Sequence, residues 1–252
     1  MRMMLIELRK TFGNVRIYLS AVCIAAAYLL GMITELQKYY YNYSIDTLLQ
    51  NMFDHVYVLF LYMLGIVGGG FFYCMEEKNG CLSYVVHRTT VTRYAVAKTT
   101  ASYLGGFVCT VLGDLFTVCA AIPVLWFRYH DWTLVFIGRG GPTDLPGNAG
   151  LLILKALYVG LLSSIAYLIT TIYPNYFIGM VMPLLLHYAY IVLCNWVTPP
   201  CFLDIRKIFD LVGGLFATLP QLFLYAVFYC ICVCSVICLI SIRFIHRRLE
   251  RG

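Results

Sequence analysis

Charged residues are scarce in this 252-residue chain. Asp, Glu, Lys and Arg together make up 12% of it, whereas 62% of the residues are hydrophobic. Soluble domains carry about 25% charged and about 45–50% apolar residues, so this chain has too little polar surface to cover a globule in water. A soluble fold is therefore excluded, and the mean hydropathy of +0.81 predicts that much of the surface faces lipid.

Paired metal-binding motifs are also absent. The chain has 11 Cys, but no Cys-x-x-Cys pair is followed by a second pair, or by a His pair, at the spacing of a zinc site. Cys230, Cys232 and Cys234 alternate along one apolar run, and on a helix this spacing points neighbours to different faces. We therefore expect no metal site and interpret the cysteines as small packing residues.

Motifs for enzymatic chemistry are missing too. There is no GxxxxGK[ST] phosphate-binding loop, so the chain is not expected to hydrolyse ATP. An EExxxR intramembrane protease motif starting at Glu76 would need Arg where Cys81 stands, and Gly160 is not followed by the Ser-Gly of a rhomboid-type serine site. We predict that the chain is not an enzyme and has no cofactor of its own.

Long apolar runs, by contrast, are abundant. A helix of about 20 apolar residues crosses a bilayer, and lipid requires that its backbone groups be satisfied internally. We predict an all-α polytopic integral membrane protein, with a single transmembrane domain over residues 1–252 that begins with an amphipathic segment over 1–12. Its six transmembrane helices are expected at 15–33, 55–73, 101–126, 151–172, 176–197 and 219–242, with a tight turn at 173–175.

Positive charges are unequally divided between the two sides of this topology. The N-terminal segment, the loop after the second span and the C-terminal tail carry twelve of the 18 Lys and Arg, and the opposite loops carry five. The positive-inside rule then places both termini in the cytoplasm of a multi-pass plasma membrane protein. The net charge of +6 is explained by anionic lipid at that face, so membrane lipids are expected partners and nucleic acid is not.

The most informative stretch is 76–98, EEKNGCLSYVVHRTTVTRYAVAK, between the second and third spans. Two acids are followed by the Asn79–Gly80 break, a short amphipathic helix and a basic segment that ends at Lys98. Such a helix lies on lipid headgroups or docks into a groove of a partner. A second connection, 198–220, is apolar with scattered charges and is expected to be an outer re-entrant or interfacial segment.

With six spans and this loop, the chain resembles the membrane (permease) subunits of the type-2 ABC exporter family. Thr89–Thr90 stands where that family usually has a proline. The resemblance implies that 76–98 is a cytoplasmic coupling loop contacting a separate ATP-binding subunit, and that the chain pairs with a second copy of itself or a related permease. The implied contact residues, several of which match the family pattern, are Glu76, Glu77, Gly80, Leu82, Tyr84, Arg88 and Arg93.

Three polar residues fall inside the expected spans. Asp114 is costly in lipid and is expected to form a helix–helix hydrogen bond, to contact a substrate or to pair with Lys155. Lys155 is otherwise expected to snorkel to the interface. His187 follows Pro183 and suits either a hydrogen bond at a kink or a polar site. Gly65 and Gly69 form a GxxxG-like face for close packing or bending.

We therefore predict an ATP-driven permease subunit that exports a hydrophobic or amphipathic compound, such as a peptide antibiotic, a lipid or a drug. The alternative is a non-transporting membrane scaffold or accessory subunit, which nothing in the sequence excludes because the coupling role depends on one loop. A secondary transporter would normally show more spans and internal repeats.

Overall fold

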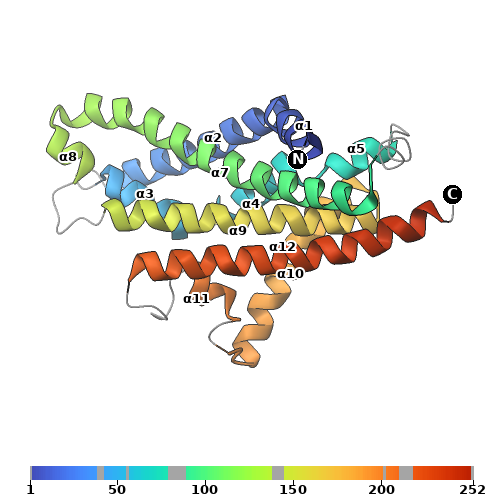
Figure 1. Ribbon diagram of the computed structural model, residues 1–252. Helices are drawn as coiled ribbons and strands as arrows, with labels where there is room; N and C mark the ends of the chain where they lie inside the picture. Colours follow the sequence, from blue (N-terminus) through green and yellow to red (C-terminus); the bar gives the residue numbers. More distant parts are fainter. Residues whose placement is uncertain are drawn as a thin grey trace.

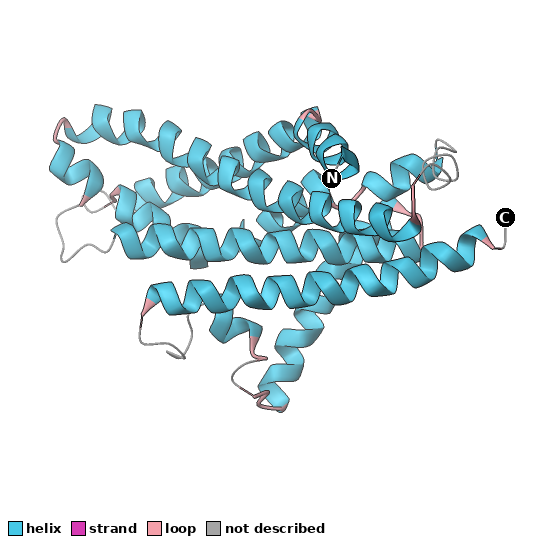
Figure 2. Cartoon of the chain, in the orientation of Figure 1, coloured by secondary structure: helices cyan, strands magenta, loops and turns pink. Residues whose placement is uncertain are grey.

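The computed structural model describes residues 2–38, 43–54, 57–78, 89–137, 145–200, 203–209 and 218–250. Within these ranges the chain is all-helical, and Figure 2 shows helices joined by short turns. The helices are α1 (Arg2–Phe12), α2 (Val15–Lys38), α3 (Ile45–Asp54), α4 (Tyr57–Gly69), α5 (Phe72–Lys78), α7 (Val91–Tyr129), α8 (Trp132–Phe136), α9 (Leu145–Ile172), α10 (Tyr176–Trp196), α11 (Ile205–Phe209) and α12 (Leu219–Leu249).

Five of these helices, α2, α7, α9, α10 and α12, are long and apolar enough to cross a membrane. This confirms an all-α fold with membrane-length helices. The expected second span is divided into α4 and α5 by a turn at Gly70–Phe71, after a run of glycines that are poor helix formers. Residues 55 and 56 lie outside the described part of the chain. The sixth span and the cytoplasmic placement of both termini therefore stay predictions.

The central helix is α9, whose most apolar window is 78% buried, against 17% for α10. The helices α2, α4, α7, α10 and α12 pack around it or around one another. In Figure 1, α5 and the C-terminal end of α12 lie toward one end of the bundle, and α3 and α8 lie toward the other. The expected turn between the fourth and fifth spans is confirmed, because α9 ends at Ile172 and Asn175 caps α10 by accepting a hydrogen bond from the Phe177 amide at 2.9 Å.

Helix α7 is much longer than the expected third span. Its 39 residues extend about 58 Å at 1.5 Å per residue, whereas the hydrocarbon core of a bilayer is about 30 Å thick. The helix begins at Val91, where Thr90 caps it by accepting a hydrogen bond from the Arg93 amide. The basic end of the 76–98 segment is thus part of one continuous rod with the third span.

Glycines allow α4 and α7 to cross at close range. A Cβ atom on Gly68 would lie 3.0 Å from the Cys109 side chain, and one on Gly69 would lie 2.7 Å from the backbone nitrogen of Gly106. The glycine-rich face predicted for the second span therefore packs tightly against the Gly105–Gly106 pair of α7. Small residues of this kind let two backbones approach in membranes.

Candidate functional site

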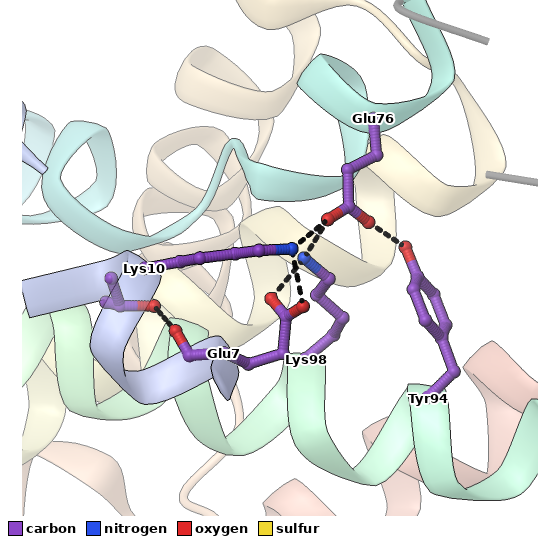
Figure 3. Close-up of polar contacts among 6 residues, drawn as sticks. Glu7, Lys10, Glu76, Tyr94 and Lys98 are labelled. Carbon is purple, nitrogen blue, oxygen red and sulfur yellow. Dashed lines mark hydrogen bonds and ion pairs between the residues drawn. The ribbon is translucent and has the colours of Figure 1, made fainter. Parts of the chain in front are cut away.

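A cluster of charged side chains joins three helices that are distant in the sequence. Glu7 and Lys10 come from α1, Glu76 from α5, and Tyr94 and Lys98 from the first turns of α7. Figure 3 shows their polar groups converging between the three helices. We call these five residues the ion cluster.

Lys98 is the centre of the ion cluster. Its ammonium donates to Glu7 Oε2 at 2.5 Å and to Glu76 Oε1 at 2.7 Å. Tyr94 donates its hydroxyl to Glu76 Oε2 at 2.8 Å. Lys10 completes the arrangement, 3.2 Å from Glu7 Oε1 and 3.7 Å from Glu76 Oε1. The Glu76 carboxylate therefore has partners on both oxygens, from two different helices.

The centre of the ion cluster is buried, and the cluster is balanced in charge. The side chain of Lys98 is 1% exposed, that of Glu7 is 3% and that of Glu76 is 16%. Two carboxylates and two ammonium groups sum to no net charge, so the group does not leave an uncompensated charge out of water. Lys98 is shared by the two buried ion pairs, with Glu7 and with Glu76, and removal of one partner of a buried pair is strongly destabilising.

Lys10 lies at the open edge of the cluster. Burial by itself lowers the pKa of its ammonium, but the neighbouring Glu7 and Glu76 carboxylates outweigh that effect and raise the pKa above 10.5. The two carboxylates therefore favour the charged form of Lys10.

Glu77 makes a second connection on the other side of α5. Successive residues on a helix are about 100° apart, so Glu77 turns away from Glu76 and pairs with Arg248 near the end of α12. Arg248 also donates to the Ile172 carbonyl at the last residue of α9, 2.7 Å away. Burial raises the pKa of the Glu77 carboxyl, against the opposing effect of Arg248. Through two adjacent glutamates, α5 is thus tied to α1, α7, α9 and α12.

The residues expected to contact an ATP-binding subunit are placed unequally. Gly80, Leu82, Tyr84 and Arg88 lie in 79–88, outside the described residues. Arg93 is exposed on the first turn of α7. Glu76 and Glu77 are engaged within the chain, so their expected role toward a partner stays a prediction. Sequence reasoning missed Glu7, Tyr94 and Arg248. Glu7 could have been noticed, because it is the only acidic residue of the basic helix α1.

The three polar residues expected inside the spans lie in two different environments. Lys155 is 3% exposed and donates to the Tyr28 hydroxyl at 3.0 Å and to the Met52 carbonyl. The Lys155 ammonium is therefore engaged within the helix bundle, and its snorkelling to the interface stays a prediction. Asp114 is also buried, and its Oδ1 atom has no hydrogen-bond partner within the described part of the chain. The positive charge of Lys155 acts on the Asp114 carboxyl, but the two form no ion pair within 4 Å among the described residues, so their expected pairing stays a prediction.

His187 is in a different environment, between α9 and α10. Its Nδ1 atom and the Tyr158 hydroxyl are 2.5 Å apart. The Tyr62 ring meets the His187 ring edge-on, with centroids 5.2 Å apart. The expected hydrogen bond of His187 to a neighbouring helix is therefore present, and it lies next to a cavity.

Comparison of the chain with family models, with curated proteins and with solved structures found no match in any of the three.

Proposed function

We propose that the chain is the membrane-spanning permease subunit of an ATP-driven transporter of the ABC exporter type. The observation that supports this best is the closure of the 76–98 segment on itself. Glu76, its first residue, and Lys98, its last, are 2.7 Å apart, and Glu77 next to them is paired with Arg248. The intervening stretch is thus anchored at both ends to buried groups.

Such anchoring suits a part that transmits force. A displacement of the 79–88 stretch would act directly on α5 and α7, and through the ion cluster and Arg248 on α1, α9 and α12. A loop attached only by its backbone would bend instead. The nucleotide on the partner must favour one of two arrangements, because a ligand shifts an equilibrium only by its differential affinity.

The full assembly proposed here has two membrane subunits and two ATP-binding subunits in the plasma membrane. The second membrane subunit is another copy of this chain or a related permease. Both termini and the 76–98 segment face the cytoplasm, where the nucleotide is. The compound exported is hydrophobic or amphipathic, since the membrane-length helices present apolar surface nearly throughout.

Co-purification tests the partner. The full chain is expressed with the ATP-binding chain encoded beside it, solubilised in mild detergent and passed over a sizing column. We expect one complex, and we expect Leu82→Asp with Tyr84→Asp to abolish it, because both charges would be placed on the amphipathic stretch. Arg128→Ala is the matched control, since it changes a charge in the last turn of α7, far from Val91, and is expected to leave the complex intact.

ATP turnover separates a transporter from the alternative. In proteoliposomes we expect the membrane chain to stimulate hydrolysis by the ATP-binding chain, and the double variant to remove this stimulation. A folded chain that forms no complex with the ATP-binding chain contradicts the proposal. A complex whose hydrolysis rate does not respond to the membrane chain supports a scaffold instead.

A further inference from the structure

A cavity of about 460 Å³ lies between α9, α10 and α12. None of the described residues that line it belongs to the ion cluster. Its volume is within the range of about 300–1,000 Å³ that small-molecule sites occupy. The polar and aromatic members of its lining are Tyr158, His187, Tyr190 and Tyr229, and most of the rest are aliphatic.

The cavity follows from the course of α10. Near its start, Gly179 allows α10 to approach its neighbours closely, because a Cβ there would lie 3.1 Å from the Phe71 ring and nearer still to Thr170. Pro183 then interrupts the helical hydrogen bonding, which kinks helices. Beyond it, α10 runs aslant and its far end stands away from α12 (Figure 1). The cavity lies between α12 and the part of α10 that follows Pro183.

Contacts of the segment 203–209 connect the helices that surround the cavity. The Phe209 ring of α11 lies 5.1 Å from the Tyr158 ring and 6.1 Å from the Tyr229 ring, so it packs between α9 and α12. Tyr190 donates its hydroxyl to the Leu203 carbonyl at 2.6 Å, which ties α10 to the segment that leads into α11. Helices α9, α10 and α12 around the cavity are therefore connected through the segment 203–209.

Two hydrogen-bonding groups in this lining remain available among the residues that the structure describes, His187 Nε2 and the Tyr229 hydroxyl. The Tyr190 hydroxyl is engaged with the backbone of 203–205, and the Tyr158 hydroxyl is engaged with His187 Nδ1. His187 Nε2 has no hydrogen-bond partner among the residues that the structure describes. None of the lining side chains is acidic, lysine or arginine, so a charged guest would lose its hydration without a counter-ion.

We propose that this cavity is a binding site for an uncharged lipophilic molecule that carries one hydrogen-bonding headgroup, such as a hydroxyl or a carbonyl. The apolar body lies against the aliphatic and aromatic walls, and the headgroup bonds to His187 Nε2, which Tyr158 orients through Nδ1. The site is formed by this chain alone, so the proposal does not depend on an ATP-binding partner.

Photolabelling of the full chain in lipid nanodiscs tests the proposal. The probe is a long-chain alcohol bearing a diazirine, and labelled peptides are identified by mass spectrometry. We expect saturable labelling of peptides from α9, α10 and α12 that excess unlabelled alcohol displaces. The corresponding fatty acid and alkylammonium probes are expected to label the same peptides at least tenfold less.

Three variants locate the site. His187→Leu and Tyr158→Phe are expected to weaken binding of the alcohol about three- to tenfold, the range for loss of one net hydrogen bond. Ala189→Trp fills the cavity from an exposed position of α10, without removing a buried group, and is expected to abolish saturable labelling. Tyr18→Phe, on the exposed face of α2, is the matched control and is expected to bind normally.

Three results would overturn the assignment. The first is labelling that does not saturate and that spreads evenly over all exposed helices, as surrounding lipid alone would produce. The second is saturable labelling that survives Ala189→Trp. The third is preferential labelling by the acid or the ammonium probe, which would show that the cavity selects a charge.

Discussion

Lys98 and Glu76 lie 2.7 Å apart, although 21 residues of chain separate them. Their contact closes the 76–98 segment at its base, and the same ammonium reaches Glu7 on α1. A single buried cation therefore holds the N-terminal helix, α5 and the start of α7 in one arrangement. This relationship yields the first two predictions.

Replacement of Lys98 by Met should strongly destabilise the fold. The variant keeps the length of the side chain but leaves the Glu7 and Glu76 carboxylates facing each other, and breaking a buried ion pair in this way costs about 3–5 kcal/mol. Reversible unfolding in mixed detergent micelles, titrated with SDS, measures the change. Lys10→Met is the control, because Lys10 is 54% exposed and should contribute below about 1 kcal/mol. Equal effects of the two variants would contradict a central role for Lys98.

A second change at Glu7 should partly rescue Lys98→Met. Lys98→Met leaves two carboxylates beside the single cation of Lys10, and Glu7→Gln removes the excess negative charge, so the double variant should be more stable than the sum of the single effects by about 0.5–3 kcal/mol. The same SDS titration on the four chains of the cycle gives this coupling energy. Strict additivity would mean that the two groups do not interact.

The pH dependence of stability should contain a contribution from Glu77. Burial raises the pKa of the Glu77 carboxyl in the folded chain above its ordinary value of 4.5. At pH values between the pKa of the unfolded chain and the higher pKa of the folded chain, the folded chain therefore holds a proton that the unfolded chain has released. The free energy of unfolding must then fall as pH rises through that window. The difference between the native chain and Glu77→Gln, measured by SDS unfolding at a series of pH values, should show this slope. A difference with the opposite slope would mean that Arg248 outweighs burial.

The close contact between α4 and α7 at Gly69 should not tolerate a larger residue. A Cβ at Gly69 would lie 2.7 Å from the backbone nitrogen of Gly106, and backbone cannot yield as a side-chain end does, so Gly69→Ala should lower the thermal stability of the detergent-solubilised chain. Gly150→Ala is the control in α9, where the nearest atom is the Leu219 side-chain end. That variant should be neutral or stabilising by up to about 1 kcal/mol through helix propensity. The reverse order would rule out tight packing of α4 on α7.

Neutralisation of Asp114 should rescue loss of Lys155. Lys155→Met deprives the Tyr28 hydroxyl and the Met52 carbonyl of a donor, and it also removes the cation that acts on the buried Asp114. Adding Asp114→Asn removes the buried carboxyl group that has lost its cation, so the double variant should unfold at a higher SDS fraction than Lys155→Met alone. No rescue would indicate that Asp114 and Lys155 contribute independently.

Sequence reasoning succeeded where a property depends on a local run of residues. Apolar length was enough to predict membrane helices at α2, α7, α9, α10 and α12, and Tyr173–Asn175 marked the turn before α10. It did not predict that the third span continues back to Val91, because a basic stretch was interpreted as a loop leading into the membrane. It also did not predict that Glu76 pairs with Lys98 and Tyr94, since the local sequence does not show which neighbouring helix a side chain will face.

Composition by itself determined that this chain is an α-helical membrane protein, because in lipid the backbone must bond within each segment and apolar length alone supplies the driving force. The pairing of polar residues was decided only by the tertiary structure. Glu7 meets Lys98, Glu77 meets Arg248 and Tyr158 meets His187, each across a separation in sequence that carries no periodic signal. Such pairs form because a charge or hydroxyl removed from water must find whichever partner the helix packing brings within reach.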